Sequence, residues 1–174
     1  MKILITDDHA VVRQGYATLL GIVLDADVEV LEAGSGDQAL SLFWERRPEV
    51  TVLDVNLPGI SGIEVARRIC QRDYQARILM FSMHDEIPLV EQAMEVGASG
   101  YITKSCAPEV LIEAVKKVAG GQLYIEHELA QQLAFRQPRG LPGRLSQITR
   151  REFEVFVMLA QGMTVNSIDR KSVV

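Results

Sequence analysis

The chain has 174 residues, enough for one well-packed domain and part of a second, because domains centre on roughly 100–150 residues. Its hydrophobic content of 48% and charged content of 24% are those of an ordinary globular protein and exclude a disordered chain. The opening MKILITDD reaches two acids too early for a signal peptide, and no long apolar run follows it. We therefore expect a cytoplasmic protein without a membrane segment.

The net charge of −5 is spread unevenly along the chain. Residues 1–122 carry 11 Lys and Arg against 18 Asp and Glu, whereas residues 123–174 carry 7 against 5. Only the second part has the sign that nucleic acid favours, and an excess of two charges is a weak signal.

Apolar strands and amphipathic helices alternate through the first 121 residues. Strands are predicted at Lys2–Thr6, at Val28–Ala33, in the run that begins at Val50 and stops at Leu57-Pro58-Gly59, at Arg77–Ser82 and at Gly100–Lys104. The helices between and after them are marked by apolar residues from Val12 to Val23, by Ala39, Leu40 and Phe43, by Ser61–Arg72, by Glu86–Val96, and by a stretch from Pro108 to Gly120. Five alternating pairs predict an α/β fold of the flavodoxin-like (βα)5 type, a doubly wound parallel sheet.

The first of these helices is expected to bury one apolar face. Its apolar residues recur at steps of three and four: Val12, Tyr16, Leu19, Leu20 and Val23.

The remainder of the chain divides into a linker and a short helical segment. Residues 122–145 combine a short helical piece, His127–Phe135, with several Pro and Gly residues, which predicts a linker. The pattern of residues 146–174 predicts an amphipathic helix at Thr149–Gln161, which would open with the capping box Thr149-Arg150-Arg151-Glu152. The predicted division is thus 1–121, 122–145 and 146–174.

Polar residues gather where the predicted strands end. They are Asp7, Asp8, Asp54, Ser82 and Lys104. The carboxyl ends of parallel strands share one edge of a sheet, so these side chains should converge there. A turn or helix-capping role for Asp54 alone is the simpler reading, and the other strand ends argue against it.

Such a cluster has a definite chemistry. Carboxylates within several Å repel one another and need a cation, and all-oxygen ligation suits Mg²⁺. Asp54 is the candidate nucleophile, because an aspartate can form an aspartyl phosphate. Lys104 would add a second positive charge, and the Ser82 hydroxyl could donate to a phosphoryl oxygen.

The motifs DD, LDVNLPGISG, FS and GYITK together resemble the receiver domain of bacterial two-component response regulators, over Met1 to about Gly121. The resemblance implies that Asp54 is the phosphoacceptor and that a sensor histidine kinase is the partner. It also implies a Mg²⁺ site formed by Asp8 and Asp54, by Asn56 through its backbone carbonyl, and by Asp7 through water. Ser82, Tyr101 and Lys104 resemble the residues that change conformation when a receiver becomes phosphorylated. Ser105 stands where many receivers have proline, so no cis peptide is expected there.

The motifs DDH, SMHDE and GASGYITKS are most similar to the NarL/FixJ class, and the tail resembles the start of a LuxR-type helix-turn-helix. The resemblance implies transcriptional control, a homodimer on phosphorylation and promoter DNA as a partner of a complete helix-turn-helix. Asp169 and the ending RKSVV depart from that pattern, so we expect an incomplete module that lacks the recognition helix. No DNA-binding residues are assigned.

Two alternatives stay open. A receiver could act without DNA, as a phosphate sink or a competitor for dimer partners. An aspartate-nucleophile hydrolase of the haloacid dehalogenase type also uses Asp and Mg²⁺, but it needs a second acid two residues after the nucleophile, where Asn56 stands. The chain is therefore expected to be a switch rather than an enzyme. The three histidines, His9, His84 and His127, lack ligand spacing and are expected at the surface or in loops.

Overall fold

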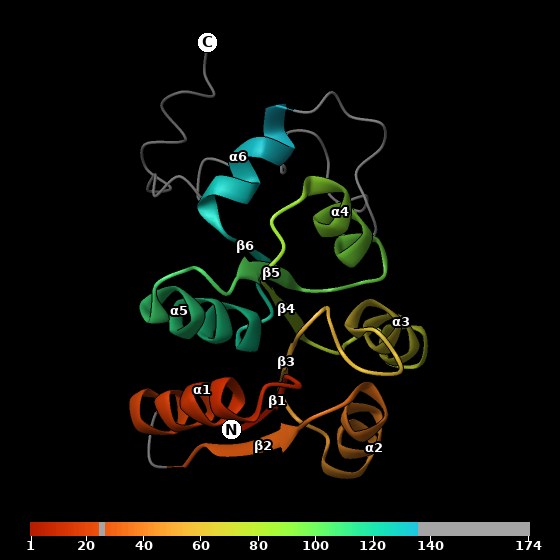
Figure 1. Ribbon diagram of the computed structural model, residues 1–174, viewed down its shortest axis with the longest axis vertical. Helices are drawn as coiled ribbons and strands as arrows, with labels where there is room; N and C mark the ends of the chain where they lie inside the picture. Colours follow the sequence, from red (N-terminus) through yellow and green to blue (C-terminus); the bar gives the residue numbers. More distant parts are fainter. Residues whose placement is uncertain (25–26, 136–174) are drawn as a thin grey trace.

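The computed structural model describes residues 1–24 and 27–135 (Figure 1). The predicted helix Thr149–Gln161, its capping box and the helix-turn-helix segment lie outside these residues. Within the described part, no helix is both long and apolar enough to span a lipid bilayer.

Parallel strands form one sheet in the order β2-β1-β3-β4-β5-β6. The strands are β1 (Lys2–Thr6), β2 (Glu29–Ala33), β3 (Val50–Leu53), β4 (Ile78–Ser82), β5 (Gly100–Thr103) and β6 (Tyr124–Ile125). The helices are α1 (Ala10–Val23), α2 (Gly36–Arg46), α3 (Gly62–Arg72), α4 (Ile87–Glu95), α5 (Pro108–Ala119) and α6 (His127–Phe135). The predicted doubly wound parallel fold is confirmed.

The strand β6 was not predicted. Its two residues are too few for a periodic pattern, and they adopt strand geometry because they pair with Gly100 and Tyr101 of β5. The chain then turns directly into α6, whose extent matches the predicted short helix. The sheet thus continues into the stretch that the sequence marked as a linker.

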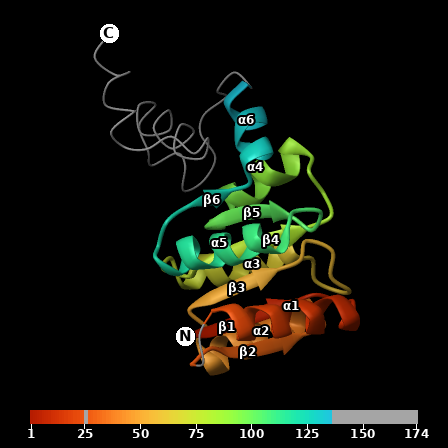
Figure 2. The same ribbon diagram turned by 90° about the vertical axis from the view of Figure 1, so that its left-hand side faces the viewer.

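Helices cover both faces of the sheet, with α1 and α5 on one side and α2, α3 and α4 on the other (Figures 1 and 2). This arrangement explains the continuous apolar runs of the central strands, since Val50 and Val52 pack under the first layer and Leu53 under the second. The helix α6 lies beyond the β6 edge next to α4, and Leu129 and Ala130 bury their side chains there.

The predicted inner face of α1 is only partly correct. Leu20 is fully buried, but Val12 is 36% exposed and Val23 is 44% exposed. Tyr16 meets Phe81 edge-on, with 4.8 Å between the ring centroids. The sequence of α1 is apolar around most of its circumference, with Arg13 as its one charged residue, so the spacing could not select which side meets the sheet.

The turn between β3 and α3 holds Asp54 in place. The Ser61 hydroxyl caps α3 by accepting a hydrogen bond from the Glu64 amide at 3.3 Å. The next residue, Gly62, donates its amide to the Val55 carbonyl at 2.9 Å. A Cβ at Gly62 would overlap the carbonyl oxygen of Asp54, so the approach of α3 to the end of β3 requires glycine.

Candidate functional site

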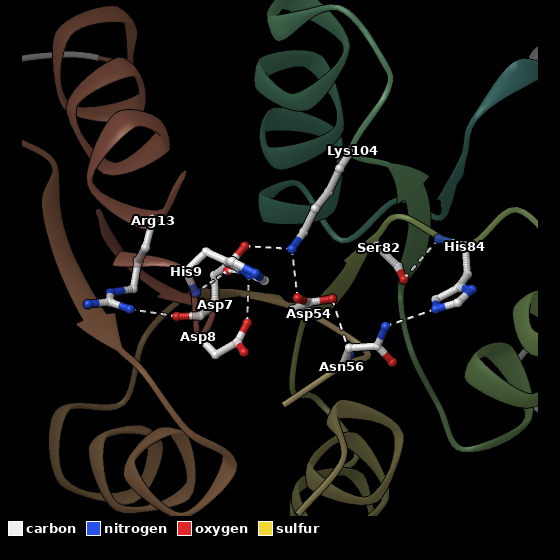
Figure 3. A network of polar contacts seen from close by, with 9 residues as sticks. All are labelled: Asp7, Asp8, His9, Arg13, Asp54, Asn56, Ser82, His84 and Lys104. Atoms are coloured by element: carbon white, nitrogen blue, oxygen red, sulfur yellow. Dashed lines mark hydrogen bonds and ion pairs between the residues drawn. The ribbon is translucent and has the colours of Figure 1, made fainter. Parts of the chain in front are cut away.

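Residues from three strand ends meet at the carboxyl edge of the sheet (Figure 3). Asp7 follows β1, Asp54 follows β3 and Lys104 follows β5. The Lys104 ammonium donates hydrogen bonds to Asp7 Oδ2 and Asp54 Oδ2, each at 2.6 Å. Asp7 is 2% exposed and Asp54 is 3% exposed, so this group of three charges is shielded from water. The structure brings these predicted site residues together.

The charges of this group are unequal, with two carboxylates around one ammonium. Burial alone would lower the pKa of Lys104, but the hydrogen bonds from its ammonium to Asp54 and Asp7 outweigh burial and raise the pKa above its usual value. Lys104 therefore stays protonated near neutral pH. One negative charge is left without a partner in the group, which favours a further cation at this edge.

Asp8 lies beside this group on the more open side, with 38% of its side chain exposed. The ring nitrogen Nδ1 of His9 lies 2.8 Å from Asp8 Oδ1 and 3.3 Å from Asp7 Oδ1. Possible ligand atoms of Asp7, Asp8 and His9 lie within 4.8 Å of one another. Carboxylate oxygens are ligands for a hard divalent cation, so the acidic donors fit such an ion by their chemistry.

Backbone contacts hold the two main acids in position. The Arg13 guanidinium donates to the backbone carbonyl oxygen of Asp7 at 2.6 Å. The backbone amide of Asn56 donates to Asp54 Oδ1 at 3.2 Å. Asp54 thus receives one hydrogen bond on each carboxylate oxygen, from Asn56 and from Lys104.

The loop after β4 connects the other predicted residues through His84. Its amide donates to Ser82 Oγ at 3.2 Å, and its carbonyl oxygen accepts from the Tyr101 hydroxyl at 2.8 Å. Tyr101 is fully buried, and this burial raises its pKa to about 12. The Ser82 side chain and the Tyr101 ring therefore contact the same residue.

The His84 ring also reaches the Asp54 side of the site through Asn56. Its Nε2 lies 2.8 Å from Asn56 Nδ2 (Figure 3). Its Nδ1 lies 3.3 Å from a carboxylate oxygen of Glu86. The side-chain amide nitrogen of Asn56 can only donate, so Nε2 of His84 accepts this hydrogen bond. The ring proton of His84 is then on Nδ1, which faces Glu86. The contact between Asn56 and His84 therefore connects the loop after β3 to the loop after β4.

The sequence did not identify Arg13 and His84 as parts of this site. His84 lies in a loop, as expected, yet it contacts three residues of the site. Its position could have indicated a role in the site, because it follows Ser82 by two residues at the carboxyl end of β4. Arg13 carried no signal, since one basic residue on a helix is usually solvated. No cis peptide occurs among the described residues, in agreement with the expectation at Ser105.

Comparisons with known proteins agree with this geometry. Residues 3–116 match the family model described as the response regulator receiver domain. The chain is 48% identical over 165 residues to the transcriptional activator protein ExaE of Pseudomonas putida, covering 93% of this chain and 77% of that protein. It is 40% identical over 168 residues to the transcriptional regulatory protein UhpA of Escherichia coli, covering 97% of this chain and 80% of that protein.

A similar solved structure is that of a LuxR-family two-component response regulator from Aurantimonas. It superposes with a TM-score of 0.71 at 40% identity, and the match covers 76% of this chain and 94% of that one. The buried acids, the lysine between them and these matches lead to one conclusion: the chain belongs to the receiver-domain family of two-component response regulators.

Proposed function

We propose that this chain is a signalling switch that accepts a phosphoryl group from a sensor histidine kinase on Asp54. The observation that carries the proposal is the buried Asp54 carboxylate, 2.6 Å from the Lys104 ammonium and beside the acidic pair Asp7 and Asp8. Phosphoryl transfer to a carboxylate asks the protein mainly for position and for neutralisation of charge. Both are available at this strand end.

The residues divide this work. The Asn56 amide and the Lys104 ammonium orient the two oxygens of Asp54, so that the attacking carboxylate is held in one position. Asp8 and Asp54, the backbone carbonyl of Asn56 and, through water, Asp7 would hold Mg²⁺. When bound, Mg²⁺ would supply positive charge that offsets the phosphoryl oxygens.

A phosphoryl group on Asp54 would also compete for existing hydrogen bonds. Lys104 would turn from the carboxylate to the phosphoryl oxygens, and the Ser82 hydroxyl would donate to them. Ser82 Oγ now accepts from the His84 amide, and the His84 carbonyl holds the Tyr101 hydroxyl. A change at Ser82 therefore reaches Tyr101 through one residue. In this proposal the aspartyl phosphate is a state of the protein rather than an intermediate of turnover, so the chain acts as a switch and not as an enzyme.

The output proposed for this switch is control of transcription, with a homodimer formed on phosphorylation and promoter DNA as a further partner. The support comes from relatives that carry the names of a transcriptional activator and a transcriptional regulatory protein. A gel-shift measurement with a promoter fragment, before and after phosphorylation, separates this role from that of a receiver acting without DNA.

The phosphoacceptor is tested by labelling with acetyl phosphate and Mg²⁺, followed by the mass of the intact protein. The parent chain should gain one phosphoryl group, and Asp54→Asn should gain none, because an amide is a poor nucleophile. Asp85→Asn, which changes an exposed acid in the β4–α4 loop, serves as the matched control and should label like the parent. Full labelling of Asp54→Asn would overturn the assignment.

A further inference from the structure

Glu126 lies between β6 and α6, beyond the residues that match the receiver family. It is bound to β5 in two ways. Its amide donates to the Tyr101 carbonyl at 3.0 Å, and its carboxylate oxygen Oε2 accepts from the Thr103 amide at 2.7 Å and from the Thr103 hydroxyl at 2.8 Å. Two of these bonds are charge-assisted, the stronger kind of hydrogen bond.

These bonds reach the residues on both sides of Lys104. The Thr103 hydroxyl also lies 2.9 Å from the Ser105 hydroxyl. A carboxylate only accepts, so the single proton of Thr103 points to Glu126, and Ser105 must donate to Thr103. The hydrogen bonds therefore run in one direction, from Ser105 to Thr103 to Glu126. The backbone beside Lys104 is therefore bound by a residue that follows the edge strand β6, whereas the Lys104 ammonium contacts residues that follow β1 and β3.

Glu126 is also bound to α6. Its carbonyl oxygen accepts from the Ala130 amide at 2.9 Å, the first hydrogen bond of the helix. Leu129 and Ala130 then pack into the core near α4. Because Leu129 and Ala130 are closely packed, the first turn of α6 is held to both the core and Glu126.

We propose that Glu126 is a positioning residue that couples Lys104 to α6. Movement of Lys104 toward a phosphoryl group would shift the turn formed by Thr103, Lys104 and Ser105, and the Glu126 carboxylate would transmit that shift to the first turn of α6. The signal would thus leave the sheet at the helix that leads into residues 136–174. Its trigger rests on the phosphorylation of Asp54 proposed above, whereas the coupling itself exists in the unphosphorylated chain.

The coupling is tested first without phosphorylation, by amide hydrogen exchange of the full chain. Glu126→Ala should speed exchange of the Thr103 amide by at least about tenfold, because that amide loses a charged acceptor. Glu126→Gln keeps an oxygen acceptor and should restore part of the protection. Glu128→Ala, on the exposed side of the same helix, is the matched control and should leave the Thr103 amide unchanged. Equal protection of Thr103 in the parent and in Glu126→Ala would overturn the proposal.

A double-mutant cycle then tests whether the path runs through Glu126. Lys104→Ala should speed exchange in α6, and it should have little further effect when Glu126→Ala is already present, because both changes interrupt the same connection. Fully additive effects on α6 would show that Lys104 and α6 are not coupled through Glu126.

Phosphorylation gives the last comparison. At matched labelling with acetyl phosphate, exchange in α6 should change in the parent and in Glu128→Ala but not in Glu126→Ala. An equal response in Glu126→Ala would refute the coupling and leave the phosphoacceptor role intact. Absence of labelling in the parent would instead refute the proposed function, while the two measurements on unphosphorylated protein would still decide the role of Glu126.

Discussion

Replacement of Lys104 by methionine in metal-free buffer should expose the electrostatic balance of the site. The Lys104 side chain is only 8% exposed and donates to Asp7 and Asp54 at 2.6 Å each, so the two accepting oxygens lie no more than about 5 Å apart. Methionine fills most of the same space but removes the charge. Loss of one partner from a buried ion pair typically costs about 3–5 kcal/mol, and we expect a loss of unfolding free energy of that size.

The second substitution makes the reasoning specific. At an effective dielectric near 20, two carboxylates about 5 Å apart repel by about 3 kcal/mol. Adding Asp54→Asn to Lys104→Met removes this repulsion, so the double variant should recover about 2–3 kcal/mol relative to Lys104→Met. The order of stability should be parent, double variant, Lys104→Met.

Urea unfolding of the parent and the variants at neutral pH, with a chelator present, measures these differences. Lys117→Met is the matched control, because Lys117 forms an exposed ion pair with Glu113 on α5. This substitution should lower the unfolding free energy by less than about 1 kcal/mol. The reasoning is refuted if Lys104→Met is no less stable than Lys117→Met, or if adding Asp54→Asn lowers stability further.

Three further outcomes follow from the structure. Gly62→Ala should cost about 3 kcal/mol and slow labelling of Asp54. Gly15→Ala, at an exposed position of α1 where a Cβ meets no atom within 4 Å, should stabilise by about 0.5–1 kcal/mol in the same unfolding assay, and similar effects of both would contradict the close approach at Gly62. Asp8→Ala should weaken Mg²⁺ binding in an NMR titration of the unphosphorylated protein, and unchanged affinity would move the metal site elsewhere. Because burial raises the pKa of Tyr101 from 10.0 to about 12, the unfolded chain ionises first, so unfolding free energy should fall as pH rises through this window, less steeply in Tyr101→Phe; equal slopes would refute this contribution.

Much of the fold could be predicted from local patterns. Strands buried on both faces show as continuous apolar runs, and helices show as spaced apolar residues between them, so the alternation of β1 to α5 was readable along the chain. Parallel topology then places the carboxyl ends of the strands at one edge. For that reason Asp7, Asp54 and Lys104 could be expected to meet, although 97 positions separate Asp7 from Lys104.

Other features depended on contacts between distant segments. The spacing of α1 allowed several inner faces, and only its packing on the sheet exposed Val12 and Val23. Asp7 and Asp8 are adjacent acids, and the way β1 ends turned Asp7 toward Lys104 and left Asp8 on the open side.

The strand β6 and the bonds of Glu126 belong to the same class. Two residues carry no periodicity, and a lone glutamate in an apparent linker resembles any solvated acid. The register of β6 on β5 determines both features, because it places Glu126 within hydrogen-bonding distance of Thr103. Local sequence patterns reflect which faces of a helix or strand are apolar. The pairing of β6 with β5 forms only in the assembled sheet, where the backbone groups along the outer edge of β5 can accept another strand.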